Sequence, residues 1–225
     1  DGFVYFSVGM KGPMEHIGVQ DLSLPYGKIM RVHDDGRIPI DNPFLKDPNA
    51  VQAIWSYGHR NPQGLEFNSE TNELWSSEMG PRGGDEINLI QPGLNYGWPL
   101  ISKGVDYTGK PINFAKLLGI EFDINNMVQP LVDLTPAPAI SSFIFYQGEQ
   151  FPEWAGNIII GSLRASDLMR FEFSQKNLVS TEYLLKDIAR FRDIEVGYDG
   201  SIYVLLENDS GGRILKISRP STKDL

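Results

Sequence analysis

The chain has 225 residues and contains 29 acidic against 20 basic side chains, which gives a formal net charge of −9 at pH 7. This balance argues against nucleic acid as a partner, because phosphate binding needs a basic face, and it suits divalent cations or a solvated acidic surface. The absence of cysteine excludes disulfides, thiolate metal sites and cysteine nucleophiles, and no apolar run reaches the length that spans a membrane.

Twelve short segments are rich in β-branched and aromatic residues or alternate in polarity, and they predict strands. In chain order they are Phe3–Val8, Lys28–Val32, Ala53–Tyr57, Gly64–Phe67, Glu73–Ser77, Glu86–Ile90, Ser142–Tyr146, Asn157–Ser162, Leu168–Phe173, Asp193–Tyr198, Ser201–Leu206 and Arg213–Ser218. The dipeptides Asp35-Gly36, Asp199-Gly200 and Gly211-Gly212 predict hairpin turns. The fold class is therefore predicted to be all-β.

The region 100–133 differs from the rest, because it is longer and mixes Lys, Asp and Asn with scattered apolar residues. We expect an inserted loop region there, with a short helix over Phe114–Leu118. No low-complexity linker divides the chain, so we expect a single domain over residues 1–225.

A repeated layout is visible in the sequence. Phe191–Ile217 reads as strand, Asp-Gly turn, strand, Gly turn and strand, and Pro62–Ile90 has the same order. The first residues, DGFVYFSVG, match this repeat from its turn onward, so we expect the chain to be a fragment cut inside a repeat. Repeats of three or four strands spaced by about 40–50 residues indicate propeller blades, here an incomplete propeller of about four blades.

The segment Trp55–Pro99 concentrates charges beside residues with special backbone conformations. The motif GHRNPQGL places Arg60 and Asn61 at the end of an apolar run, before a Pro and a Gly that turn the chain. The motif EMGPRGGDE then sets three carboxylates around a glycine- and proline-rich turn. These are Glu78, Asp85 and Glu86. Such a combination suits a small-molecule or metal site better than a packed core.

The motifs GHRNPQGL, GPRGGDEINLI and NYGWP, in this order, resemble those of the soluble pyrroloquinoline-quinone-dependent aldose sugar dehydrogenases, the glucose/sorbosone dehydrogenase family. The resemblance continues at GKIMRV, DNPF, SSFIFY, NIIIGSLR and RFRDIEVGYDGSIYVLLE, and it covers nearly everything except about 108–132. It implies a six-bladed β-propeller with its N-terminal blades outside this chain, and a periplasmic or secreted location.

The resemblance implies that Arg60 and Asn61 contact pyrroloquinoline quinone (PQQ), a flat ortho-quinone with three carboxylates. Arginine suits carboxylates because its donors are permanently charged and bidentate. Arg190 and Arg192 would contact the same cofactor, and strand alternation puts them on one face. Arg164, which stands where relatives often carry Lys, is a further candidate for contact with the cofactor. From the residues alone, Arg60 could instead pair with a neighbouring carboxylate, and the later arginines could form a solvated strand face.

The family also holds calcium on backbone carbonyls of a Gly-Pro turn, here Gly80 and Pro81, since such carbonyls are hard oxygen donors. A second, structural calcium is expected on Glu86 and on Tyr96 through its carbonyl, with Asp106 as a further candidate. The alternatives are an ordinary Gly-Pro turn and a surface carboxylate at Glu86.

The implied reaction is oxidation of an aldose at its anomeric carbon to a lactone, with hydride transfer to the calcium-bound quinone and a quinone or cytochrome as electron acceptor. The general-base His is expected upstream of residue 1, so the fragment itself is expected to be inactive. None of the three histidines matches that base. We expect His59 to be structural and satisfied by backbone groups, and His16 and His33 to be exposed.

Two other classes of function stay open from the sequence. One is a calcium-dependent lactonase on a six-bladed propeller, which would hold its metal on Asn, Asp and Glu side chains and leave the arginines without a ligand. The other is a propeller that serves as a non-catalytic binding module and need not keep Arg60, Arg190 and Arg192.

Overall fold

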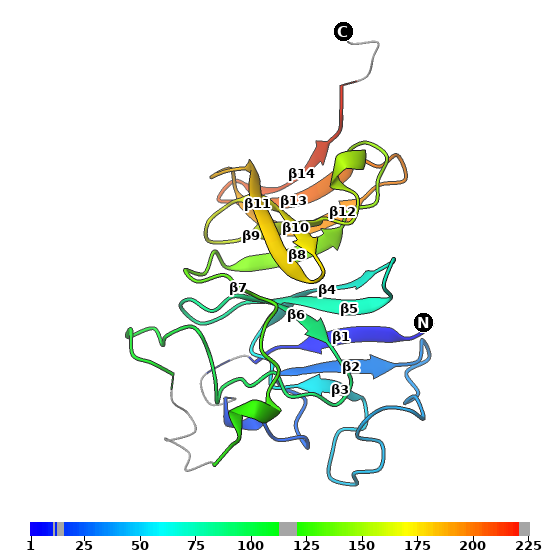
Figure 1. Ribbon diagram of the computed structural model, residues 1–225, viewed down its shortest axis with the longest axis vertical. Helices are drawn as coiled ribbons and strands as arrows, with labels where there is room; N and C mark the ends of the chain where they lie inside the picture. Colours follow the sequence, from blue (N-terminus) through cyan, green and yellow to red (C-terminus); the bar gives the residue numbers. More distant parts are fainter. Residues whose placement is uncertain (11, 13–15, 113–120, 221–225) are drawn as a thin grey trace. The chain divides into compact units, whose positions relative to one another are not determined.

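The structure is a computed structural model that describes residues 1–10, 12, 16–112 and 121–220 (Figure 1). The predicted all-β class is confirmed: the described residues form four antiparallel sheets, each made of strands that are consecutive in the sequence. Three single-turn 3-10 helices are described, η2 (Ile17–Val19), η3 (Ile124–Asn126) and η4 (Pro152–Trp154). The helix expected over Phe114–Leu118 lies outside the described residues.

The first two sheets occupy the N-terminal half of the chain. Their strands are β1 (Val4–Val8), β2 (Lys28–Val32) and β3 (Ile54–Tyr57), followed by β4 (Pro62–Asn68), β5 (Glu73–Glu78), β6 (Glu86–Ile90) and β7 (Val132–Asp133). The order is β1-β2-β3 in one sheet and β4-β5-β6-β7 in the other. Sequence order thus equals spatial order, as is usual for consecutive strands, although long loops join β1 to β2, β2 to β3 and β6 to β7.

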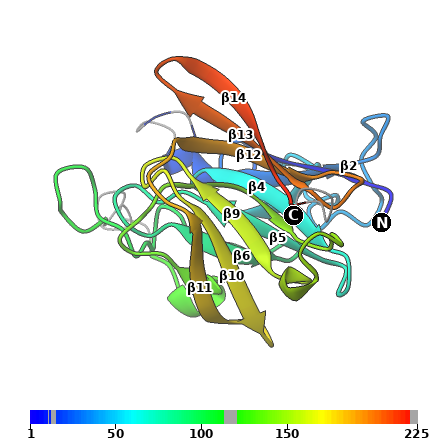
Figure 2. The same cartoon turned by 90° about the horizontal axis from the view of Figure 1, so that it is seen from above.

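The last two sheets have the same meander arrangement. Their strands are β8 (Ile140–Phe145), β9 (Ile158–Ser162), β10 (Leu168–Ser174) and β11 (Asn177–Leu185), followed by β12 (Arg190–Val196), β13 (Ile202–Asn208) and β14 (Gly211–Ile217). Figure 2 shows β9, β10 and β11 as adjacent ribbons. The chain divides into two compact units, residues 1–65 with 74–137 and residues 66–73 with 138–225.

Twelve predicted strands are found, and two strands were missed. The first is β7, whose residues Val132 and Asp133 pair with β6, so the end of the expected insertion 100–133 belongs to a sheet. The second is β11, an edge strand whose nine residues are mostly exposed and give no alternation of apolar and polar side chains. Pairing with β10, rather than its own pattern, determines this strand.

One of the three turn predictions was shifted and one was incomplete. The Asp199-Gly200 turn does join β12 to β13, with Gly200 at φ 75°. The last hairpin turns at residues 209–210, because Asn208 already pairs with Gly211 in the ladder. Asp35-Gly36 forms a tight turn closed by a 2.9 Å hydrogen bond from the His33 N–H to the Arg37 carbonyl, but no strand follows it.

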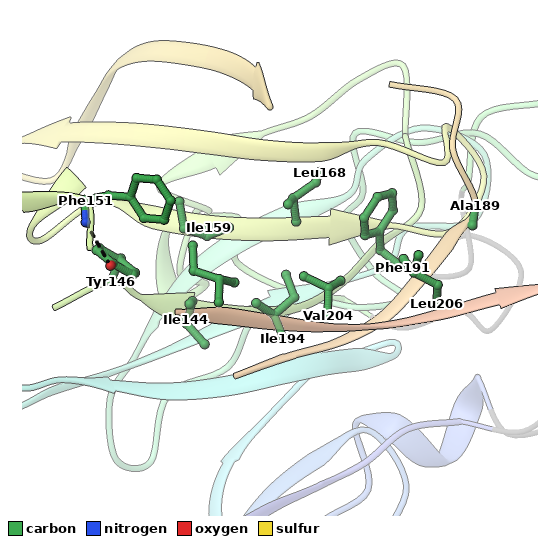
Figure 3. Close-up of a cluster of buried hydrophobic side chains, with 11 residues drawn as sticks. Ile144, Tyr146, Phe151, Ile159, Leu168, Ala189, Phe191, Ile194, Val204 and Leu206 are labelled. Carbon is green, nitrogen blue, oxygen red and sulfur yellow. Dashed lines mark hydrogen bonds between the residues drawn. The ribbon is translucent and has the colours of Figure 1, made fainter. Parts of the chain in front are cut away.

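The second unit contains a core between the β8–β11 sheet and the β12–β14 sheet. Its members are buried apolar side chains from both sheets and the loops beside them (Figure 3): Ile144, Tyr146, Phe151, Ile159, Leu168, Ala189, Phe191, Ile194, Ile202, Val204 and Leu206. Burying each large side chain contributes roughly 1.5–3 kcal/mol. The core therefore explains the alternation of buried and more exposed side chains along β13.

A hydroxyl group fixes the loop that follows β8 in this unit. The Tyr146 hydroxyl donates a 2.6 Å hydrogen bond to the Gly200 carbonyl and accepts one of 3.1 Å from the Phe151 N–H.

Elsewhere in the unit, Glu66 lies partly buried. Burial, followed by the negative charges of Glu195 and Asp193, raises the pKa of Glu66 to about 7.

The first unit buries two cations of β2. The Arg31 guanidinium lies between the rings of Phe3 and Trp55, at 3.8 and 4.5 Å, and donates two 3.1 Å hydrogen bonds to Asp41. These contacts attach the loop after β2 to the sheet.

No helix among the described residues combines the length and the apolar character needed to span a bilayer.

Lys28 is the other buried cation, and its side chain is fully inaccessible to solvent. Its Nζ donates hydrogen bonds of 2.8 Å to the Val19 carbonyl and 2.7 Å to the Tyr26 carbonyl. Burial lowers the pKa of Lys28 to about 8. The Lys28 side chain therefore holds the loop between β1 and β2 through the backbone carbonyls of that loop.

Candidate functional site

A cavity of about 280 Å³ in the first unit contains three of the residues predicted for the cofactor and its calcium, together with Asp106, the further candidate for the second calcium. Arg60, Asn61 and Pro81 line it together. We call it the Arg60 cavity, and its complete described lining is Met10, Gly12, His16, Arg60, Asn61, Pro81, Trp98, Asp106, Tyr107 and Ile112. Its walls are thus largely apolar and aromatic, with a guanidinium and a few polar groups, as expected for a small-molecule site.

The Arg60 guanidinium is held by neutral groups. Its Nη1 donates a 2.9 Å hydrogen bond to the Met79 carbonyl, and its Nη2 donates one of 3.2 Å to the Tyr107 hydroxyl. The guanidinium carbon lies 5.5 Å from the centre of the Trp98 ring. Its Nε is buried and has no hydrogen-bond partner among the described residues. Among the described residues Arg60 forms no ion pair, in contrast to the alternative of a structural pair, and Asp106 is the carboxylate that lines the same cavity.

A chain of buried polar groups lies behind Arg60. The Ser56 hydroxyl is 2.9 Å from His59 Nε2, and His59 Nδ1 is 3.0 Å from Glu78 Oε2. Glu78 Oε1 accepts hydrogen bonds from the backbone N–H groups of Arg60 and Asn61. Ser56 and His59 are fully buried, and Glu78 is 5% exposed. His59 is thus structural, but the expectation that backbone groups satisfy it was wrong.

The turn after β5 depends on glycine and on a buried carboxylate. Asp85 is 1% exposed, and its Oδ1 accepts a 2.9 Å hydrogen bond from the Gly80 N–H. A Cβ at Gly80 would lie 2.2 Å from the Gly83 carbonyl oxygen, closer than any contact allows. A side chain is excluded at Gly80 because the turn brings backbone carbonyls so close.

A second cavity of about 280 Å³ in the same unit joins Glu86 and Tyr96, the two residues predicted for a second calcium. We call it the Glu86 cavity. Its lining also includes Ser102, Lys103 and Gln129. The two predicted cation positions therefore belong to two distinct cavities, one beside Pro81 and one beside Glu86.

Glu86 is surrounded by other carboxylates. In the sheet it lies opposite Glu78 on one side and opposite Asp133 on the other. Burial first, and then the charges of Glu78, Asp133 and Asp85, hold the pKa of Glu86 well above its usual range. Among the residues that the structure describes, no group of three or more His, Asp or Glu side chains is arranged to hold a metal.

Tyr96 closes the Glu86 cavity on the side of His59. Its ring stacks on the His59 imidazole with centroids 4.5 Å apart. Its hydroxyl donates a 2.6 Å hydrogen bond to the Leu89 carbonyl and accepts one of 2.9 Å from the Gln91 N–H. Burial raises the pKa of Tyr96. The side chain is thus fully engaged, which leaves the backbone as the part of Tyr96 that can offer an oxygen.

The other predicted cofactor arginines belong to the second unit. Arg190 and Arg192 share one partner, Glu207 on β13: Arg190 Nε lies 3.3 Å from Glu207 Oε2, and the Arg192 guanidinium contacts the same oxygen. Arg192 is the extra residue of a bulge, since Phe191 pairs with Leu206 and Asp193 pairs with the adjacent Leu205. All three charged side chains are 41–47% exposed.

Glu207 is held in its charged form by these arginines, because the hydrogen bond from Arg192 lowers the pKa of the carboxyl. The predicted common face of Arg190 and Arg192 is therefore present. Arg164 follows β9 with an exposed side chain, and its N–H donates a 3.1 Å hydrogen bond to the Pro138 carbonyl.

Two histidines differ from the sequence expectation of exposed side chains. His16 is partly buried, lines the Arg60 cavity and lies 5.3 Å from the Trp98 ring. Burial, followed by the positive charge of Arg60, lowers the pKa of His16. His33 is partly buried against Phe3, with ring centroids 5.0 Å apart. Both depend on contacts that are distant in sequence or on loops, and no local pattern signals them.

Comparison with known proteins agrees with the motifs. The family model for glucose / sorbosone dehydrogenase matches residues 1–216. Aldose sugar dehydrogenase YliI of Escherichia coli (strain K12) is 40% identical over 222 residues, which covers 97% of this chain and 58% of that protein.

Solved structures show the same likeness. The apo-form of the soluble aldose sugar dehydrogenase from Escherichia coli has a TM-score of 0.88 at 37% identity, over 97% of this chain and 61% of that one. The PQQ-bound form of aldose sugar dehydrogenase from Streptomyces coelicolor has a TM-score of 0.71 at 25% identity, over 96% and 58%. The chain thus spans about three-fifths of the length of these relatives.

Proposed function

The chain belongs to the glucose/sorbosone dehydrogenase family, and from this premise we propose that it forms the cofactor-binding part of a quinoprotein that oxidises aldose sugars to lactones. The observation that carries the proposal is the Arg60 cavity, where a guanidinium that forms no ion pair with the described residues lies 5.5 Å from the centre of the Trp98 ring. We further propose the six-bladed propeller and the periplasmic or secreted location that go with this family.

The Arg60 cavity fits a flat, anionic cofactor such as PQQ. A permanently charged guanidinium whose Nε has no hydrogen-bond partner in the described chain offers both charge and a donor to a carboxylate. The Trp98 ring supplies a flat apolar surface, and Asn61 adds a polar side chain. We propose Arg60 and Asn61 as cofactor contacts. For Arg164, Arg190 and Arg192, which belong to the second unit, cofactor contact stays a prediction from the family resemblance.

Glu86 and the nearby backbone carbonyls of the first unit suit calcium. Glu86 lies opposite Glu78 and Asp133 in the sheet, and a divalent cation beside Glu86 would relieve the repulsion between these charges. Calcium takes oxygen ligands that include backbone carbonyls. We propose the carbonyls of Gly80 and Pro81 for the calcium at the cofactor, and Glu86 with the Tyr96 carbonyl for a structural calcium.

When bound, PQQ and its calcium supply a two-electron acceptor and a Lewis acid. The protein residues bind and orient. Arg60 would bind an anionic edge of the cofactor, because its own guanidinium is held by Met79 and Tyr107. The side chains of Met10, Trp98 and Ile112 give the cavity apolar walls, beside which electrostatic contacts are stronger than in bulk water.

The test is a titration of the purified protein with PQQ, followed by absorbance, with calcium and with EDTA. We expect saturable binding that depends on calcium. Arg60→Ala should weaken the binding about 10- to 100-fold, as for loss of a charged hydrogen-bond donor. Absence of PQQ binding together with calcium-dependent hydrolysis of a lactone would favour the lactonase class instead.

A further inference from the structure

We propose that Glu78 and His59 are positioning residues for the Arg60 cavity, which set the orientation of Arg60 and Asn61 toward the ligand. The inference rests on the proposed function for the identity of that ligand. The geometry of the network is independent of the proposed function, and every contact in the network lies within the first unit. Glu78 is the last residue of β5, and its carboxylate accepts hydrogen bonds from the backbone N–H groups of both Arg60 and Asn61.

The same strand end also holds the Arg60 side chain. Arg60 Nη1 donates to the Met79 carbonyl at 2.9 Å, and the Met79 N–H donates to the Asn61 carbonyl at 3.1 Å. Residues 78–79 therefore accept hydrogen bonds from both the backbone N–H and the guanidinium of Arg60. A change in the Glu78 side chain would move the charged group and the backbone from which it projects.

His59 fixes the orientation of the Glu78 carboxylate. Its Nδ1 bonds Glu78 Oε2, its Nε2 bonds the Ser56 hydroxyl, and its face stacks on Tyr96. An imidazole held at both nitrogens and on one face has no freedom to rotate. Since Tyr96 also lines the Glu86 cavity, this network connects the walls of the two cavities.

The order Ser56, His59 and Glu78 is that of a hydrolytic Ser-His-acid triad, but its location excludes this chemistry. Ser56 and His59 have 0% exposure, and Glu78 uses one oxygen on two backbone N–H groups. No substrate atom reaches the serine hydroxyl. The network therefore acts through Arg60 and Asn61, and not as a nucleophile.

Glu78→Leu and Glu78→Gln separate positioning from bulk packing. Leucine removes every acceptor, whereas glutamine keeps one carbonyl oxygen for the Arg60 and Asn61 N–H groups. The matched control is Ser76→Ala, two residues earlier on the same strand, because Ser76 is fully buried and its hydroxyl has no hydrogen-bond partner among the described residues.

Two quantities are measured on each folded variant: hydrogen–deuterium exchange of the Arg60 and Asn61 amides, and the Kd for PQQ with calcium from absorbance titration. Glu78→Leu should accelerate exchange at both amides and raise the Kd about 10- to 100-fold. Glu78→Gln should recover most of both effects, and Ser76→Ala should match the wild type. Wild-type exchange and wild-type Kd in Glu78→Leu would overturn the inference.

If Glu78→Leu does not fold, His59→Phe replaces it, since a phenyl ring keeps the stack on Tyr96 and removes only the two nitrogen contacts. Faster exchange at Arg60 and Asn61 is again the supporting result, and unchanged exchange the contradicting one. Failure of the wild type to bind PQQ would reject the proposed function, while the exchange data would still decide the positioning role.

Discussion

Arg60 donates a 2.9 Å hydrogen bond from Nη1 to the carbonyl oxygen of Met79, the residue directly before the Gly80-Pro81 turn. This contact joins the residue predicted to bind the cofactor to the turn predicted to bind calcium. Both lie in one unit and line or border one cavity. We therefore expect the proposed cofactor and cation sites to respond together to a change at Arg60.

We expect Arg60→Lys to weaken PQQ binding even though it keeps the charge. Lysine cannot donate to Met79 and Tyr107 at once from a planar fork, so the cation loses its fixed direction. The Kd from absorbance titration should rise about 10-fold or more. Arg37→Lys, an exposed arginine paired with Asp35, is the control and should leave the Kd unchanged. Equal Kd values for Arg60→Lys and wild type would contradict this role.

We expect Gly80→Ala to destabilise the first unit. The added Cβ would lie 2.2 Å from the Gly83 carbonyl oxygen and 2.4 Å from that of Gly84, and backbone atoms must move to make room. Urea denaturation should show a free energy of unfolding lower by about 1–3 kcal/mol. Gly212→Ala is the matched control, because its nearest atom would be 3.7 Å away. The prediction fails if both variants unfold at the same urea concentration.

Lys28 should make stability rise with pH above neutrality. Burial lowers its pKa in the folded state to about 8, below the unfolded value, so between these values the unfolded chain binds more protons. The unfavourable burial of the charge is present below pH 8 and disappears as pH rises to about 10.5. Relative to Lys28→Met, the wild type should gain up to about 3 kcal/mol over this window.

The measurement is denaturation of both proteins at pH 7 and pH 10. Lys28→Met leaves the Val19 and Tyr26 carbonyls without their donor, so it should be less stable than wild type at pH 10. A difference in stability between the two proteins that is the same at both pH values would show that Lys28 does not titrate in this range.

Glu66 should have the opposite effect in the second unit. Its pKa is raised to about 7 by burial and by Glu195 and Asp193, so the folded state binds more protons than the unfolded one between about pH 4.5 and 7. The free energy of unfolding that protonated Glu66 contributes at low pH is therefore lost as pH rises through about 7. Because Glu66 is partly exposed, the expected size is about 1–2 kcal/mol.

Glu66→Gln should accordingly stabilise the protein at pH 8 and leave it unchanged near pH 4.5, as measured by thermal unfolding at both values. Glu121→Gln, at an exposed position, is the control and should change neither. A stabilisation by Glu66→Gln that is equal at both pH values would point to packing rather than to charge.

Much of the fold followed from local pattern. Alternation and β-branched residues predicted twelve strands, because a half-buried strand needs this pattern to cover a core such as that around Phe191 and Val204. The two strands that escaped, β7 and β11, carry no such pattern, since one is two residues long and the other is largely exposed. Their strand conformation comes from hydrogen bonding to a neighbour.

The site divides in the same way. The sequence by itself determined the residue types for the cofactor and metal sites, because Arg60 and the Gly80-Pro81 turn lie within short motifs whose chemistry is local. Only the tertiary structure decided what holds them. Glu78 reaches His59 across 19 residues, and Glu207 reaches Arg190 through a hairpin with a bulge. Strand register sets such partners, because it brings side chains that are distant in sequence within hydrogen-bonding distance. The sequence of either segment alone does not predict the pairing.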